Sequence, residues 1–259
     1  NQGANPETQY AHDSFGNVVA EIDSLDHVTN YTYDSTGTYR TRSKNALGHT
    51  VDYSYNLGTG NLLSEVRHGL NKTYTYDIFG RTKIEIISPD SVNSPTKNYT
   101  YDFDGIAPEI IKIETKNNDG DYSEDIFVYD GFSNPVQIRT LLNSNTQIAK
   151  NYFYDEKYRI EQEQNPYFES YSSTLVPPAE GLKAKYNYDT LDRVINLTKQ
   201  DSNSVIVIFN KTEITQFDEN NNRIDYVVDA YDRIKNVREH NGAEIYNTNY
   251  TYRNDDKIT

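Results

Sequence analysis

The sequence predicts an all-β chain, a long antiparallel meander of β-hairpins that coils into a curved sheet. Three observations predict this fold: tyrosine pairs one residue apart, turn sequences of the form Asp-x-x-Gly, and turns spaced by about 11 residues. Tyrosines at i and i+2 lie on one face of a strand, because strand side chains alternate between the faces. The composition, with 24 Tyr, 9 Phe and no Trp or Met, favours pleated sheet over long helices.

The clearest copy of the repeat is residues 74–81, Tyr-Thr-Tyr-Asp-Ile-Phe-Gly-Arg. Asp77 is expected to open a turn, and Gly80 to close it with a positive φ. This order fits a type I turn followed by a left-handed glycine bulge. The apolar and β-branched segment 82–87 is the predicted returning strand. The eight residues therefore encode the bend of one hairpin.

Related turns recur along the whole sequence, and the first steps between them are 10, 11, 11 and 11 residues. The others begin at Asp13, Asp23, Asp34, Asn45, Asn56, Asp102, Asp130, Asp155, Asp189, Asp218 and Asp229, with a weaker turn near Gly69 and a degenerate copy at 252–257. Where glycine is replaced, the substitutes are types that tolerate positive φ, namely Asp26, Asp192, Asn221 and Asp232. One hairpin thus occupies about 21 residues.

We expect the repeat motif to have a structural role. Its predicted residues are Asp13, Gly16, Tyr33, Asp34, Gly37, Gly48, Tyr55, Tyr76, Asp77, Gly80, Arg81, Tyr101, Asp102, Tyr129, Asp130, Tyr154, Asp155, Tyr188, Asp189, Arg193, Phe217, Asp218, Asp229 and Arg233. The tyrosine pairs are expected to form ladders with β-branched residues between them, each cross-strand contact contributing roughly 0.2–1 kcal/mol. A row of tyrosines can alternatively bind sugars.

The repeat is interrupted at two places. Residues 88–95 are expected to form a longer loop, and residues 158–185 an irregular loop insertion, because its prolines cannot donate ladder hydrogen bonds. Residues 201–204 should form a turn into a strand, 205–209, that is buried on both faces. Residues 1–259 otherwise form a single repeat segment, and the absence of Met suggests a fragment of a larger protein.

The charge, hydropathy and cysteine content argue against nucleic-acid partners, membrane insertion and cysteine-based sites. The net charge is -14, with acidic residues spread along the chain, which argues against nucleic acid. No apolar run approaches the roughly 18 residues of a membrane span, so membrane insertion by this segment is not expected. Cysteine is absent, which excludes a disulfide framework and thiolate metal sites.

Catalytic and cofactor-binding patterns are not found in the sequence. The five histidines lack metal-ligand spacing, and we expect them in solvent-exposed turns. The acidic loop 117–125 loosely suggests a calcium site, although a solvated hairpin turn is the simpler interpretation. We therefore assign no catalytic residue, cofactor or metal; a glycosidase-like carboxylate pair is the weakest alternative.

The Tyr-Asp-x-x-Gly-Arg unit, at about 21-residue spacing, resembles the YD or RHS repeat family. This family includes bacterial RHS proteins, the B and C components of insecticidal toxin complexes, and the shells of teneurins. The most similar phrases are residues 45–63 and 74–81. The resemblance extends over essentially the whole chain and is more specific for the repeat than for a subfamily.

The resemblance implies a β-strip that spirals into a hollow shell around a toxic C-terminal effector. The family's self-cleavage site carries an Asp-Pro dipeptide, which this sequence lacks, so we carry over no catalytic role. The expected partners are neighbouring repeats and the enclosed effector, and the expected location is secreted or cell-surface. The alternative is an adhesion module that binds a host-surface protein or glycan through loops 88–95 and 165–181.

Overall fold

The computed structural model describes residues 7–178, 181–253 and 257–258. These residues contain 22 strands in one sheet, and the described part of the chain has no helix. This confirms the predicted all-β antiparallel meander. Contacts between Cα atoms divide the chain into two compact units, Asn1–Asp102 with Ile111–Asp125, and Phe103–Ile110 with Ile126–Thr259. No helix suited to spanning a membrane occurs among the described residues.

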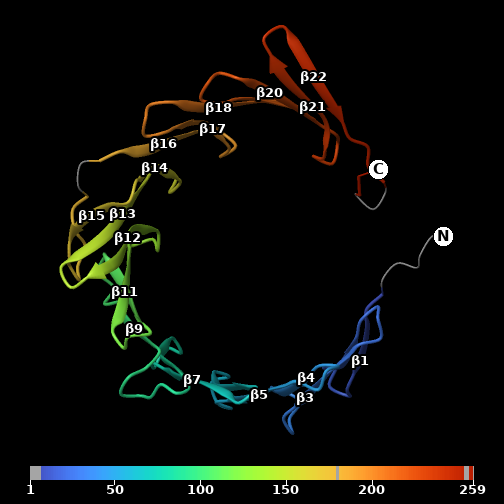
Figure 1. Cartoon of the computed structure of the whole chain (residues 1–259), viewed down its shortest axis with the longest axis vertical. Helices are drawn as coiled ribbons and strands as arrows, with labels where there is room; N and C mark the ends of the chain where they lie inside the picture. The colour runs from blue at the N-terminus through green and yellow to red at the C-terminus, as the bar shows by residue number, and fades with distance from the viewer. Residues whose placement is uncertain (1–6, 179–180, 254–256, 259) are drawn as a thin grey trace. The chain divides into compact units, whose positions relative to one another are not determined.

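The strands of the N-terminal unit pair antiparallel in chain order, and Figure 1 shows them following one another along a bent sheet. Their bounds are β1 Gln9–His12, β2 Val18–Ile22, β3 Val28–Tyr33, β4 Arg40–Lys44, β5 Thr50–Tyr55, β6 Leu62–Arg67, β7 Leu70–Tyr76, β8 Thr82–Ile87 and β9 Lys97–Asp102. Strands β10 (Glu109–Lys116) and β11 (Tyr122–Tyr129) each contribute residues to both units.

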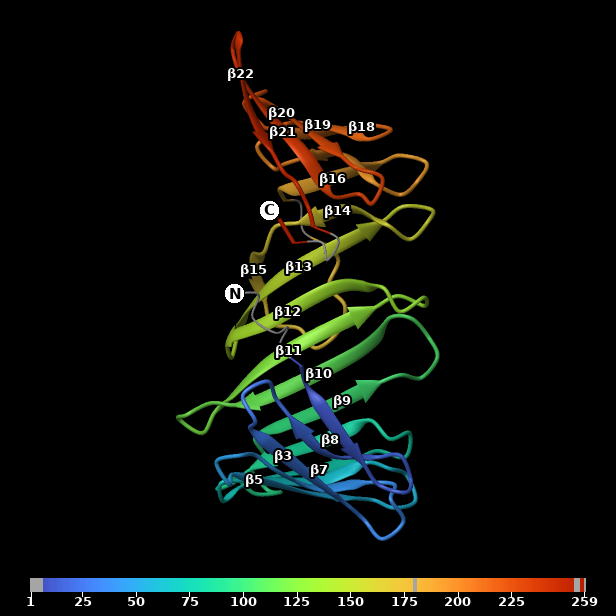
Figure 2. The same ribbon diagram turned by 90° about the vertical axis from the view of Figure 1, so that its right-hand side faces the viewer.

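The C-terminal unit continues the meander, and Figure 2 shows β12 and β13 side by side within it. The bounds are β12 Pro135–Asn143, β13 Thr146–Tyr154, β14 Ile160–Gln164, β15 Tyr167–Ser170, β16 Lys183–Tyr188, β17 Val194–Thr198, β18 Ser204–Asn210, β19 Glu213–Phe217, β20 Arg223–Val228, β21 Ile234–Asn241 and β22 Glu244–Asn249.

The insertion expected at 158–185 is more ordered than the sequence indicates. Strand β13 pairs with β14 along one part of its edge and with β15 along another, while β14 pairs onward with β16. Pro166 lies at the step from β14 to β15, where no ladder donor is required. Of the described residues in this range that follow β15, those outside strands are 171–178 and 181–182.

The predicted bulges are present at the turns. In the β7–β8 pair the register shifts between Thr75 and Tyr76, immediately before Asp77. Equivalent shifts precede the turns of the β3–β4, β16–β17 and β20–β21 pairs. A bulge at each turn increases the local twist of the strands.

Few apolar side chains are buried in this sheet. Among the described residues, the buried apolar ones are Ile126, Val128, Ala149 and Ala184. Large apolar side chains on the strands, among them Ile206, Ile208 and Ile245, are 42% to 51% exposed. Within the described residues, most of the sheet is therefore a single layer without a second layer packed on it.

The strand predicted to be buried on both faces shows this directly. In β18, Ile206 and Ile208 are 42% and 51% exposed, so that prediction is wrong. The apolar run predicts a covered strand, but the described residues place no layer over these two side chains.

Candidate functional site: the repeat turns and their tyrosines

Most repeat turns are closed by the Asp or Asn that opens them, and the turn at Asp155 is an example. The backbone N–H of Asp155 donates to the carbonyl of Arg159 (2.9 Å), and that of Tyr158 donates to the carbonyl of Asp155 (3.0 Å). Asp155 Oδ1 also accepts hydrogen bonds from the backbone N–H groups of Lys157 (2.9 Å) and Arg159 (3.0 Å). These bonds, with the Arg159 guanidinium, lower the pKa of the Asp155 carboxyl.

The same bonds recur in most predicted turns. A side-chain oxygen accepts from the backbone N–H groups at i+2 and i+4 in the turns that begin at Asp13, Asp23, Asn45, Asp77, Asp130, Asp189, Asp218 and Asp229. The turn at Asp34 is one residue longer, and its Oδ1 accepts from Thr38 and Tyr39. In the loop that follows Asp102, Gly105 (φ 86°) donates to the Glu109 side chain.

The fourth turn position requires a left-handed backbone. Gly16, Gly37, Gly48 and Gly80 have φ values of 87°, 68°, 81° and 79°. The predicted substitutes Asp26, Asp192, Asn221 and Asp232 have φ values of 61° to 63°, as expected. Three further substitutes, Ser133, Tyr158 and Ser202, were missed and have φ values of 66°, 61° and 70°. Their position three residues after Asp130, Asp155 and Lys199 was the available signal.

A tyrosine immediately before the turn connects it to the previous turn on the same edge of its unit. The Tyr188 hydroxyl donates to the carbonyl of Ile160 (2.7 Å), the first residue after the turn at 155–159. Burial raises the pKa of Tyr188. The equivalent hydroxyl-to-carbonyl pairs are Tyr33–Val18, Tyr76–Leu62, Tyr101–Thr82, Tyr154–Pro135 and Tyr252–Ile234, at 2.7 to 3.2 Å.

Three predicted aromatic positions differ from this pattern. Tyr55 stacks on the ring of Tyr39, with the centroids 5.0 Å apart. Phe217 ends β19 directly before Asp218 and has no hydroxyl to donate. Tyr129 ends β11 directly before Asp130.

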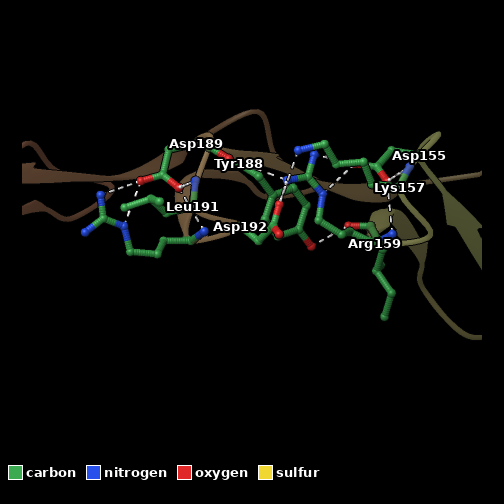
Figure 3. A network of polar contacts seen from close by, with 9 residues as sticks. Asp155, Lys157, Arg159, Tyr188, Asp189, Leu191 and Asp192 are labelled. Atoms are coloured by element: carbon green, nitrogen blue, oxygen red, sulfur yellow. Dashed lines mark hydrogen bonds and ion pairs between the residues drawn. The ribbon is translucent and has the colours of Figure 1, made fainter.

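An arginine at the last turn position joins successive turns. Arg159 Nε donates to Asp155 Oδ2 (2.7 Å), and its Nη1 donates to Asp192 Oδ1 of the next turn (2.5 Å) (Figure 3). Its guanidinium also lies 4.4 Å from the ring centroid of Tyr188, within cation–π range. Arg81, Arg193 and Arg233 pair likewise with the aspartate of their own turns. Their guanidinium groups lie 4.4, 4.0 and 4.7 Å from the rings of Tyr101, Phe209 and Tyr252.

The tyrosine rows are interleaved with charged residues, so the prediction of β-branched neighbours is wrong there. Tyr53 lies opposite Glu65, and Glu65 lies opposite Lys72 on the next strand. Lys72 forms an ion pair of 2.9 Å with Glu85, which lies opposite Tyr74. The sequence signal was a glutamate four residues after a turn, as in Glu21, Glu65, Glu85 and Glu163.

A ladder of carboxamides in the C-terminal unit was missed entirely. Gln137 donates to Asn151 (2.7 Å), and Asn151 donates to Gln164 (2.7 Å), across β12, β13 and β14. All three side chains are fully buried. We call these three residues the carboxamide ladder. Buried polar groups require such partners, because an unpaired one costs about 1–3 kcal/mol.

A second missed cluster surrounds Asp225, a buried residue of β20. Its carboxylate accepts from Arg223 (2.8 Å) and Thr215 (2.7 Å), and contacts His240 Nε2 at 2.8 Å. Burial alone would raise the pKa of Asp225, but these hydrogen bonds outweigh it and lower the pKa to about 2. The prediction that every histidine lies in an exposed turn is therefore wrong for His240, which lies in β21.

The remaining candidate for ligand chemistry is the acidic loop at 117–125. It forms a repeat turn in which Asn117 N–H donates to the Asp121 carbonyl (2.7 Å) and Gly120 N–H donates to the Asn117 carbonyl (3.1 Å). No group of three or more metal-ligating side chains is found in the described part of the chain. Two shallow hollows, of about 410 and 430 Å³, lie beside the turns at 23–27 and 189–193.

The fold and these contacts define a repeat protein whose units are hairpins joined by turn-to-turn bonds. Solved structures with this architecture include TcdB2–TccC3, with a TM-score of 0.77, 14% identity, and coverage of 98% of this chain and 16% of that chain. The TcdB2–TccC3–Cdc42 structure gives a TM-score of 0.76 and 13% identity over 98% of this chain and 19% of that chain. No family model matches this chain, and no curated protein matches it.

The comparison confirms the resemblance to toxin-complex components at the level of the fold. The chain spans less than a fifth of the length of these similar structures. At identities of 13% and 14%, the comparison shows that this chain and the similar structures share a fold.

Proposed function

We propose that this chain is a non-catalytic segment of an RHS-type shell wall, which encloses a C-terminal effector of the same polypeptide. One observation carries the proposal: the sheet is a single layer with four buried apolar residues among those described. Apolar strand side chains such as Ile206 and Ile208 stay exposed on this surface. A wall would use that surface to enclose another polypeptide.

The similar structures support this role. They are toxin-complex structures, and one of them is described as TcdB2–TccC3 without the hypervariable C-terminal region. A hypervariable C-terminal region in a protein of similar fold fits a shell that accepts different contents. We accordingly place the protein outside the cell or at its surface, with neighbouring repeats and the effector as partners.

The turn tips favour a second candidate, an adhesion or recognition module. Leu47, Phe79, Phe132 and Tyr231 lie at the third position of their turns and are 69% to 79% exposed. Exposed apolar side chains of this kind can mark a contact with another protein or a glycan. Specific binding of this chain to a glycan array or to cells would favour that candidate.

Limited proteolysis tests the proposal. The full-length protein that contains this segment is purified, treated with trypsin, and analysed by denaturing mass spectrometry. We expect a C-terminal piece that resists trypsin while the shell is intact and is degraded once the shell is opened by denaturant. Degradation of the C-terminal part at the same rate with the shell intact or opened would contradict the enclosing role.

A further inference from the structure

Within the C-terminal unit, the segment 171–178 is held against β12 through its backbone. Gln137 Nε2 donates to the Val176 carbonyl (2.9 Å), and Gln137 Oε1 accepts from the Val176 N–H (3.3 Å). Arg139 donates to the carbonyl of Ser172 (2.6 Å). A side-chain amide therefore binds this segment in the way that a neighbouring strand would.

The burial pattern shows that the sheet recognises the backbone of this segment. Gln137 and Arg139, on the sheet, are 0% and 1% exposed, whereas Leu175 of the segment is 40% exposed. The sheet therefore contacts backbone groups that every polypeptide carries, while segment side chains remain accessible. Recognition of this kind depends weakly on the sequence that is bound.

The same face of the sheet continues beyond the covered region. Gln164 of the carboxamide ladder lies opposite Lys183 of β16. Asn187, four residues later on β16 and so on the same face, lies opposite Asn196 of β17. Opposed residues direct their side chains to one face, so Asn187 and Asn196 lie on the face of the carboxamide ladder. Asn196 lies opposite Ile206 of β18.

Most side chains of this continuation are exposed in the described structure, whereas Asn196 is half-buried. Asn187 is exposed, and Ile206 and Ile208 are 42% and 51% exposed on the same face. The Asn196 Oδ1 atom is shielded from solvent and accepts no hydrogen bond from the described residues. A backbone N–H from a bound segment would supply the missing donor after the carboxamide turns about χ2, and so offset the cost of an unpaired buried acceptor.

We propose that the face of β16–β18 binds an extended polypeptide, with Asn187 and Asn196 bonded to its backbone and Ile206 and Ile208 packed on its side chains. Residues 171–178 show the same chemistry on β12, which is joined to β16 through β13 and β14. The inference rests on the proposed function for its natural occupant, which is an extended segment of the enclosed effector. A wall with such a site would hold an unfolded chain whatever its sequence.

Photo-crosslinking of this chain tests the site independently of the shell. The photoreactive residue p-benzoylphenylalanine replaces Ile208 in one variant and Tyr246 in a control. Tyr246 is 52% exposed. The strand pairings from β18 to β22 place Tyr246 on the same face as Val207, which is the face opposite to Ile208. The probe is reduced, carboxamidomethylated lysozyme, which cannot refold, compared with native lysozyme.

We expect the Ile208 variant to crosslink the unfolded probe at least fivefold more than the Tyr246 variant, and to crosslink native lysozyme no more than the control does. Adding Asn187→Ala and Asn196→Ala should lower the yield several-fold. Equal yields from positions 208 and 246, or equal yields with native and unfolded probe, would overturn the inference.

The same substitution in the full-length protein separates this inference from the proposed function. A crosslink from position 208 to the C-terminal piece supports both. A trypsin-resistant C-terminal piece without that crosslink overturns the binding site and leaves the shell intact. A crosslink to lysozyme by this chain, with no resistant piece in the full-length protein, supports the site and overturns the shell.

Discussion

The hydroxyl of Tyr188 donates a 2.7 Å hydrogen bond to the carbonyl of Ile160, which lies 28 positions earlier in the chain. The same tyrosine ring lies under the guanidinium of Arg159. This guanidinium is bonded to Asp155 of its own turn and to Asp192 of the turn that follows Tyr188. In a sheet with few buried apolar side chains, such turn-to-turn bonds supply the contacts that a core would otherwise supply.

Removing this hydroxyl should destabilise the chain. We expect Tyr188→Phe to lower the free energy of unfolding by about 1 kcal/mol, because the Ile160 carbonyl loses its side-chain donor. Urea denaturation measures the change. Tyr231→Phe is the matched control, since Tyr231 is 79% exposed at a turn tip, and its effect should be close to zero. Equal effects of the two substitutions would argue against the Tyr188 bond.

The turn geometry makes Gly80 more sensitive than its neighbour Arg81. Gly80→Val should cost more than Arg81→Ala, because a β-branched residue at a φ of 79° is strained by roughly 2 kcal/mol or more. Gly80→Asn should cost less than Gly80→Val, since Asn tolerates positive φ. Thermal unfolding measures all three. A melting temperature of Gly80→Val equal to that of the wild type would refute the turn assignment.

The carboxamide ladder should hold the segment 171–178 in place. Gln137→Leu removes both bonds to Val176 and leaves Asn151 Oδ1 without that donor, so we expect a loss of about 2 kcal/mol. Hydrogen exchange at the Val176 amide should also accelerate more than tenfold. Gln9→Leu, at an exposed position of β1, is the control. Unchanged exchange at Val176 would show that other contacts hold the segment.

Asp225 should make stability depend on acid pH. Its pKa is about 2 when folded and 3.8 when unpaired. A lowered folded-state pKa contributes stability that is present above about pH 4 and is lost as the pH falls towards 2, amounting to about 2 kcal/mol. Asp225→Asn should therefore differ from the wild type by about that amount at pH 7 and much less at pH 2. A constant difference from pH 7 to pH 2 would contradict this assignment.

The turns were predictable because each is encoded locally. An aspartate and a residue that tolerates positive φ lie within four positions, so the φ values at Asp192 and Asp232 follow from the sequence. The partners of the tyrosine hydroxyls could not be predicted in this way. The Tyr188 hydroxyl bonds to the backbone carbonyl of Ile160, and every residue carries such a carbonyl, so the sequence does not single out Ile160.

The features that the sequence did not predict depend on what covers each strand. The run 205–209 is apolar enough to indicate a buried strand, yet Ile206 and Ile208 are exposed because no described layer covers them. Gln137 indicates a surface position by its polarity, yet it is buried because a distant segment folds over it. Neither outcome is encoded near the residue concerned.

A cryo-electron microscopy map of the full-length protein would test the enclosing wall most directly. We predict that this chain lies in the wall of a closed shell, with one face of its sheet against density from an enclosed polypeptide. A map in which both faces of the sheet are open to bulk solvent, and the C-terminal part lies outside, would contradict the account.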